Sequence, residues 1–174
     1  MATTGMREQL DSLGLASAAS LPGGLCDDAS KYVNDTSLEM QWAMKSWHYS
    51  EIHFKLISTV DPSTLQLTRL DDLIYRQFRK KFKRMKIDII NEGELKTDEA
   101  KARWRPFCKL FESVMDEYNF GTLLRLDASK GYTETNTILV TRIQFYAIEI
   151  ARNRQGLNSS HYKPDSQSDD IQPV

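Results

Sequence analysis

The densest group of charged side chains in this sequence lies between positions 76 and 86. Seven of these eleven residues are Lys or Arg and none is acidic. Like charges at helical spacing repel one another by a few tenths of a kcal/mol per pair, roughly, so such a run costs stability unless something uses it. Helical spacing places four of these cations on one side of the helix, namely Arg76, Arg79, Lys80 and Lys83. Arg84, which follows Lys83 directly, is the fifth candidate.

Two interpretations of this basic run remain open. The first is a solvated surface that also places cations near the C-terminal end of a helix, where the helix dipole favours them. The second is a binding surface for an acidic partner, with the five cations as candidate contact residues. RNA is a less favoured partner, because no aromatic side chains alternate with the charges and the formal net charge of the chain is -1.

Catalytic and metal-binding patterns are absent from the sequence. His48 and His53 lie five positions apart, which rotates a helix by about 500° and points them to different faces. Acidic neighbours such as Asp71 and Asp72 likewise diverge on a helix. We therefore expect no catalytic, cofactor or metal site, and no enzymatic activity. The sequence does not decide whether carboxylates from distant segments meet in the fold.

Length and composition indicate one globular domain. The chain has 174 residues, of which 40% are hydrophobic and 27% charged. Cys26 and Cys108 are distant and form no CxxC pair, so we expect reduced thiols and a cytoplasmic location. The sequence shows neither a secretory signal pattern nor an apolar run of membrane-spanning length, so no membrane partner is expected.

The apolar pattern predicts a mostly α fold, a single compact helical domain of about five to seven helices. We assign residues 1–34 to a flexible N-terminal tail, 35–156 to the domain and 157–174 to a flexible polar C-terminal tail. A long helix is expected from Ser37 to about Ser58, buried over much of its circumference. Met40, Met44 and Trp47 lie on its predicted apolar stripe, and both tryptophans of this helix are expected to be core anchors.

Further helices are expected from Thr68 through the basic run and from Thr97 onward, the latter interrupted or restarted at Pro106. An apolar stripe from Phe107 to Tyr118 is expected to end at Gly121, a residue suited to the position after a helix. The segment 122–127 fits either a short strand or one more helical turn. A last helix is expected over 138–154, with a strand at its start as the alternative, so a short strand or hairpin near 122–140 stays open.

Polar residues interrupt these last apolar segments. We expect buried pairing among them rather than contact with a partner. They are Arg125, Asp127, Arg142, Glu149 and Arg152.

Three strings in the chain resemble the polysaccharide-biosynthesis-domain-containing protein 1 family: Trp104–Phe107, Tyr118–Asp127 and Arg142–Arg154. Phrases beginning at Glu39, Lys55 and Leu70 fit as well. The resemblance extends over about residues 35–156 and implies a mostly helical domain. Members similar to this chain are understood as dedicated chaperones of translation elongation factor 1-alpha that engage its nascent GTP-binding domain. The resemblance assigns no client-contact residues.

The resemblance therefore implies a client-specific cytosolic chaperone for co-translational protein folding in elongation-factor biogenesis. Its expected partners are translation elongation factor 1-alpha and the ribosome-nascent chain complexes that carry it. One alternative is a polysaccharide-modifying enzyme such as a methyltransferase, which would need a glycine-rich cofactor loop and a parallel sheet that the sequence does not show. The other alternative is an RNA-associated adaptor that uses the basic helix.

Overall fold

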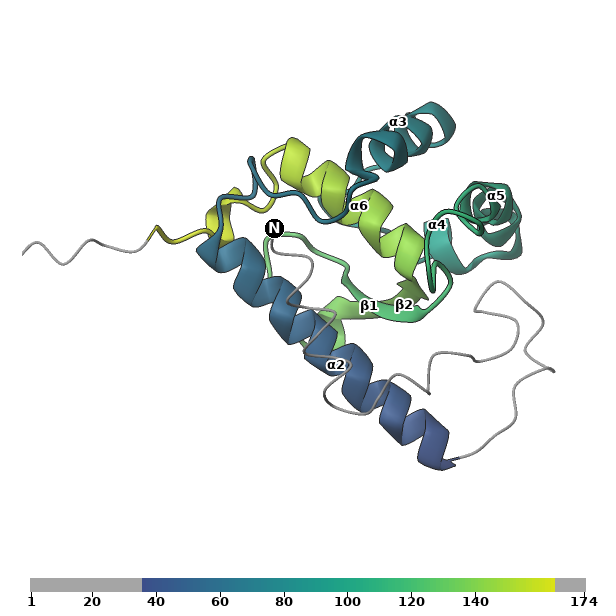
Figure 1. Ribbon diagram of the computed structural model, residues 1–174, viewed down its shortest axis with the longest axis horizontal. Coiled ribbons are helices and arrows are strands. Elements are labelled where there is room, and N and C mark those ends of the chain that lie inside the picture. Colours follow the sequence, from purple (N-terminus) through teal and green to yellow (C-terminus); the bar gives the residue numbers. More distant parts are fainter. Residues whose placement is uncertain (1–35, 165–174) are drawn as a thin grey trace, which may run out of the picture.

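The computed structural model describes residues 36–164, which form five α-helices and one small sheet (Figure 1). The predicted N-terminal tail and Cys26 lie outside the described residues, as do residues 165–174. A mostly helical fold with a short hairpin is thereby confirmed. In chain order the helices are α2 (Thr36–Thr59), α3 (Asp71–Lys81), α4 (Gly93–Lys96), α5 (Asp98–Lys109) and α6 (Arg142–Arg154). Residues 36–164 also include two short 3-10 turns, η3 (Glu134–Asn136) and η4 (Ser159–His161).

The sheet is an antiparallel hairpin of β1 (Gly121–Arg125) and β2 (Thr137–Thr141). Its register pairs Gly121 with Thr141 and Arg125 with Thr137. The open choice at 122–127 is thus resolved as a strand, and the predicted helix over 138–154 begins as one too. The β-branched residues around Ile138 favour the extended form. Helix α6 starts only at Arg142, where Thr141 and Gln144 form a capping box.

Helix α6 is the central element of the domain, with ten of its 13 residues buried. It packs against α3 and both strands (Figure 1). Aromatic rings from α3, the turn after it and α5 pack together in the core. The rings of Phe82 and Trp104 stack with centroids 4.0 Å apart, and Trp104 is 1% exposed. The apolar stripes predicted around Phe107 and Ile143 therefore do meet in one core.

The long helix α2 has nearly the predicted bounds but less burial than expected. One face packs on β1, and its N-terminal end extends past the hairpin (Figure 1). Met40, Met44 and Trp47 are 62%, 70% and 44% exposed, so the prediction of core positions is wrong for them. Trp42 is half-buried and donates its indole N–H to Gly121 O at 3.1 Å. Among residues 36–164, only one side of α2 has a neighbour to cover it.

Two helices end earlier than the apolar spacing predicts. Helix α3 ends at Lys81, because Phe82 leaves helical geometry (φ -120°, ψ 52°). Helix α5 runs through Pro106 and ends at Lys109, and a series of turns follows. The predicted stripe to Tyr118 is therefore wrong at Leu110 and Val114, which are exposed. Gly121 begins a strand rather than ending a helix.

The domain continues beyond residue 156, so the boundary expected there is corrected for residues 157–164. Asn158 is fully buried, and the Lys163 N–H donates to Ser58 O at 3.0 Å, which ties this segment to the end of α2. Among the described residues no helix combines the length and the apolar character needed to cross a membrane.

Candidate partner-binding surface

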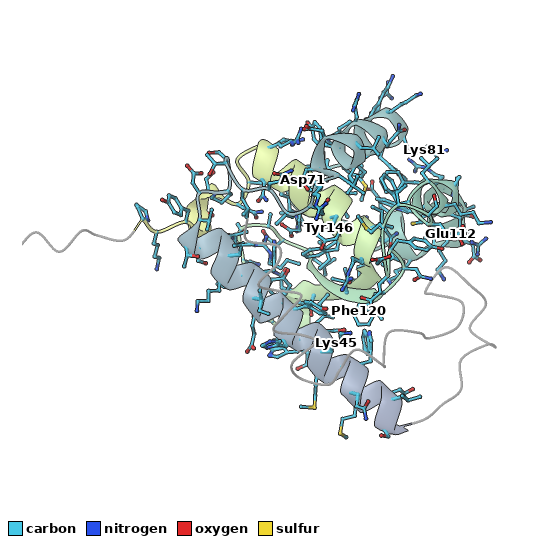
Figure 2. The ribbon with its side chains drawn as sticks, in the orientation of Figure 1. Lys45, Asp71, Lys81, Glu112, Phe120 and Tyr146 are labelled. Carbon is cyan, nitrogen blue, oxygen red and sulfur yellow. The ribbon has the colours of Figure 1, made fainter. Side chains whose placement is uncertain are left out.

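The five predicted contact residues lie on α3 and the turn that follows it. Arg76 and Lys80 are exposed on the helix and Arg79 is half-buried, whereas Lys83 and Arg84 are exposed beyond the helix end. Figure 2 shows long side chains from α3, with Lys81 labelled, pointing away from the body of the molecule. The prediction of a single helix for these five residues is therefore wrong, because they lie partly on α3 and partly on the turn after it. We call these five residues the basic surface.

No carboxylate within residues 36–164 forms an ion pair with the basic surface. The two acids that begin α3 are occupied elsewhere. Asp71 accepts the backbone N–H groups of Leu67 and Thr68 at 3.0 and 2.7 Å, and Asp72 lies 2.5 Å from Arg154. Because the cations have no acidic partner among the described residues, their charge is available to an external anion.

The basic surface borders a shallow hollow of about 510 Å³ between the end of α3 and the end of α6. Arg79 is fixed at its edge by a hydrogen bond from Nη1 to Met85 O at 3.3 Å. Cations, one acid, one amide and three apolar side chains meet here. The lining residues are Arg79, Lys83, Arg84, Met85, Lys86, Ile87, Asp88, Gln155 and Leu157.

The chemistry of the lining residues is suited to binding an acidic peptide. Lysine and arginine donate to carboxylates, and the half-buried Leu157 offers apolar contact beside them, whereas Met85 is buried in the core. The candidate residues omitted Lys86, although it belongs to the same basic run. The sequence-based prediction also did not include Gln155 and Leu157. These two residues lie beside the basic run only because of how α6 packs, and the local sequence does not indicate that position.

A second group of charged residues lies wholly inside the domain, around Glu149 of α6. Arg125 Nη2 lies 3.2 Å from both carboxylate oxygens, and Arg152 Nη1 lies 2.8 Å from Oε1. Asn158 donates to Oε2 at 3.0 Å. All four side chains are fully buried, so the expected buried pairing is confirmed for Arg125, Glu149 and Arg152.

The two guanidiniums hold further segments in place. Arg152 donates to Ile87 O and Leu126 O at 2.7 and 3.1 Å. Arg125 donates to Ala128 O at 2.9 Å and to Asn158 Oδ1 at 2.7 Å. These contacts join α6, the hairpin, the 87–88 segment and the C-terminal turn, so the network has a structural role.

The charges of this network set the protonation of its members. Burial alone would raise the pKa of Glu149, but the charges of Arg125 and Arg152 outweigh it and hold the pKa well below its usual range. Burial lowers the pKa of His53 to about 4, although Glu149 opposes the shift. His53 Nδ1 lies 2.8 Å from the Tyr132 hydroxyl, and burial raises the pKa of that tyrosine. His53 is therefore neutral at pH 7.

The two remaining polar residues pair nearer the surface. Arg142 Nη1 lies 2.9 Å from Glu117, with both side chains partly exposed. Asp127 lies 3.5 Å from Lys130 and accepts hydrogen bonds from Ser129, which lower its pKa. Neither residue pairs with another member of the predicted group and neither is fully buried, so the prediction of buried pairing is wrong for both Arg142 and Asp127.

The histidines point in different directions, as their spacing indicates, with His48 exposed and His53 buried. Within the described part of the chain no three His, Cys, Asp or Glu side chains cluster in a way that could hold a metal ion.

The fold defines a class: a mostly helical domain built around one antiparallel hairpin. The same class is seen in the solution NMR structure of a Saccharomyces cerevisiae protein, with a TM-score of 0.68 and 42% identity. That match covers 77% of this chain and 95% of the yeast chain. The sequence model of the PBDC1 protein family matches residues 38–163, and the chain belongs to this family, as its motifs indicate.

Two relatives illustrate how far the similarity extends. Protein PBDC1 of Homo sapiens is 50% identical over 163 residues, covering 92% of this chain and 67% of the human protein. The Protein PBDC1 homolog of Saccharomyces cerevisiae is 46% identical over 129 residues, covering 72% of this chain and 88% of the yeast protein.

Proposed function

We propose that this protein is a client-specific cytosolic chaperone that assists co-translational folding of the GTP-binding domain of translation elongation factor 1-alpha. Family membership supports the proposal, because the chaperone role is what the resemblance to this family implies. The structural observation that carries it is the basic surface, an exposed group of cations without acidic partners among the described residues, beside a hollow lined with apolar and amide groups. Such a surface binds an acidic segment of a client without any chemical step.

The alternatives predict different features. A polysaccharide-modifying methyltransferase would use a cofactor loop at the end of a parallel sheet, whereas the described sheet is an antiparallel hairpin. An RNA adaptor would use the same cations but would bind with a steep salt dependence. The experiment therefore has to distinguish binding of the client, binding of RNA and binding of neither.

A charge-reversal pair tests the role of the basic surface. The test variant carries Arg76→Glu, Lys80→Glu, Lys83→Glu and Arg84→Glu, and omits Arg79 because it contacts the backbone. The control reverses the same number of exposed cations elsewhere, at Lys55, Lys101, Lys109 and Lys163. Both variants change the net charge equally, so a general electrostatic effect would appear in both.

Binding is measured on ribosomes stalled after synthesis of the GTP-binding domain of elongation factor 1-alpha, with an unrelated stalled chain as reference. The wild type and the control should bind the cognate complex, and the test variant should bind at least about tenfold more weakly. Equal binding of cognate and unrelated chains would overturn the chaperone proposal. If the protein binds the complexes only until exposed RNA is digested with nuclease, the result would instead support the RNA-adaptor alternative. Equal affinity of test and control variants would remove the basic surface from the mechanism.

A further inference from the structure

Helix α2 carries an apolar stripe that the described part of the domain leaves uncovered. Met40, Met44 and Trp47 follow one another at intervals of four and three residues, so they lie on one face of the helix. They are 62%, 70% and 44% exposed. On the side that faces the hairpin, by contrast, the polar Ser46 is buried and donates to Gly121 O. We call Met40, Met44 and Trp47 the α2 stripe.

The α2 stripe is too small to hold a separate partner by itself. Its three side chains offer on the order of a few hundred Å² of apolar surface. A stable interface between two proteins buries about 800 Å² on each side, and association of free partners also costs translational and rotational freedom. A segment tethered to the same chain avoids most of that cost, because the tether raises its effective concentration to about the millimolar range. Size therefore favours an occupant from within the chain.

The sequence offers one segment with the matching pattern. Met6, Leu10 and Leu13 repeat the spacing of the α2 stripe, again four and then three residues apart. They belong to residues 1–35, which lie outside the described part and end where α2 begins. The 22 residues from 14 to 35 can span up to about 70 Å when extended. The stripe itself is about 10 Å long and starts one turn into α2, so reach does not limit the contact.

We propose that the segment from Met6 to Leu13 binds the α2 stripe of its own chain, with Met6, Leu10 and Leu13 as the contacting side chains. The methionines suit this role, because their unbranched side chains adapt to an apolar partner. The contact shields the exposed part of α2 from other apolar surfaces. This inference goes beyond the proposed function and does not depend on it.

Disulfide trapping in the full chain tests the contact. Cys26 is first replaced by Ser, which leaves Cys108 as a buried thiol. Leu10→Cys is then combined with Met44→Cys on the stripe or, as the control, with Leu38→Cys. Leu38 is also exposed and lies closer to the segment along the chain, but it sits about 120° around the helix from Met44. Under mild oxidation the Met44 pair should form an intramolecular disulfide at least about tenfold faster than the Leu38 pair.

Equal or slower trapping at Met44 would overturn the proposal. Disulfide-linked dimers whose rate of formation rises with protein concentration would overturn it as well, because they would identify a second copy as the occupant. An independent readout uses the variant Leu10→Asp with Leu13→Asp. It should increase acrylamide quenching and red-shift the emission of Trp47, isolated by difference from matched Trp47→Phe proteins. The control, Thr4→Asp with Ser12→Asp, adds the same charges away from the apolar pattern and should change neither. An unchanged Trp47 signal in both would contradict the contact.

Discussion

Arg125 of β1 and Glu149 of α6 form an ion pair that is closed off from solvent on all sides, with Arg125 Nη2 3.2 Å from each carboxylate oxygen. Arg152 shares the same carboxylate, so two buried cations depend on one buried anion for their counter-charge. A buried pair of this kind gives little net stability by itself, but removing one partner leaves an uncompensated charge in a medium of low dielectric constant. Glu149 is therefore the residue on which the network depends.

Replacing Glu149 with Gln should destabilise the domain by about 3–5 kcal/mol, because both guanidiniums lose their counter-charge. Urea denaturation at pH 7 measures this change in the free energy of unfolding. Glu117→Gln is the control, since it removes the partner of Arg142 at a partly exposed site and should cost at most about 1 kcal/mol. Similar losses of stability in the two variants would show that the buried network is no more sensitive to loss of its carboxylate than the partly exposed pair.

His53 should make the stability of the domain depend on pH between about 5 and 6.5. Its pKa is lowered to about 4 in the folded protein, so the unfolded chain binds the additional proton in this range. The free energy of unfolding consequently falls as pH falls, by about 2 kcal/mol at pH 5 relative to pH 7 from this residue. Glu149 does not contribute there, because its stabilisation is lost only as pH drops below the carboxyl's ordinary range.

Urea denaturation of His53→Gln and His48→Gln across this range isolates the effect. The His53 variant should lose that part of the pH dependence, whereas the exposed His48 variant should keep it. A wild-type profile that is flat between pH 5 and 7 would contradict the assignment of His53 as a neutral buried histidine.

Gly121 should not tolerate a side chain. A Cβ at this position would lie 2.9 Å from Trp42 Nε1, at the point where α2 crosses the hairpin. Gly121→Ala should therefore cost about 1–3 kcal/mol through overpacking. Gly131→Ala is the matched control, because its Cβ would meet Phe54 at an ordinary 3.5 Å. Thermal melting of both variants decides the point, and an equally stable Gly121 variant would mean that α2 can shift away from the hairpin.

Two tryptophans should differ sharply when they are truncated. Trp104 is stacked in the aromatic core, so Trp104→Ala should cost about 3–5 kcal/mol. Trp47 is 44% exposed and lies outside that core, so Trp47→Ala should cost at most about 1 kcal/mol. Chemical denaturation compares them directly. A loss at Trp47 as large as that at Trp104 would contradict the assignment of Trp47 to a position outside the aromatic core.

Local sequence patterns predicted several features correctly. The start of α2, the Thr97 cap of α5 and the opposite directions of His48 and His53 all depend on spacing along a single helix. The buried pairing around Glu149 was also predictable in kind, because charged residues within long apolar segments need partners. Which cation would meet which acid was not, since Arg125 and Glu149 come from different elements.

Other predictions failed or stayed open where a neighbouring element decides the outcome. Apolar spacing shows that Met44 and Trp47 share a face of α2, but only packing decides whether anything covers that face. Segment 122–127 carried both strand and helix signals, and its pairing with residues 137–141 settled the choice. Asn158 is likewise buried where it donates to Glu149, and the polar sequence around Asn158 does not predict this contact.

The sequence by itself determined the family, the mostly helical character and the basic run, because each is a property of residue type and local spacing. Only the tertiary structure decided where the helices end, which apolar residues stay exposed and how the basic surface meets the end of α6. The reason is physical: propensity and periodicity act over one or two turns. Burial and ion pairing are instead shared between segments, such as β1 and α6, that only the folded chain brings together.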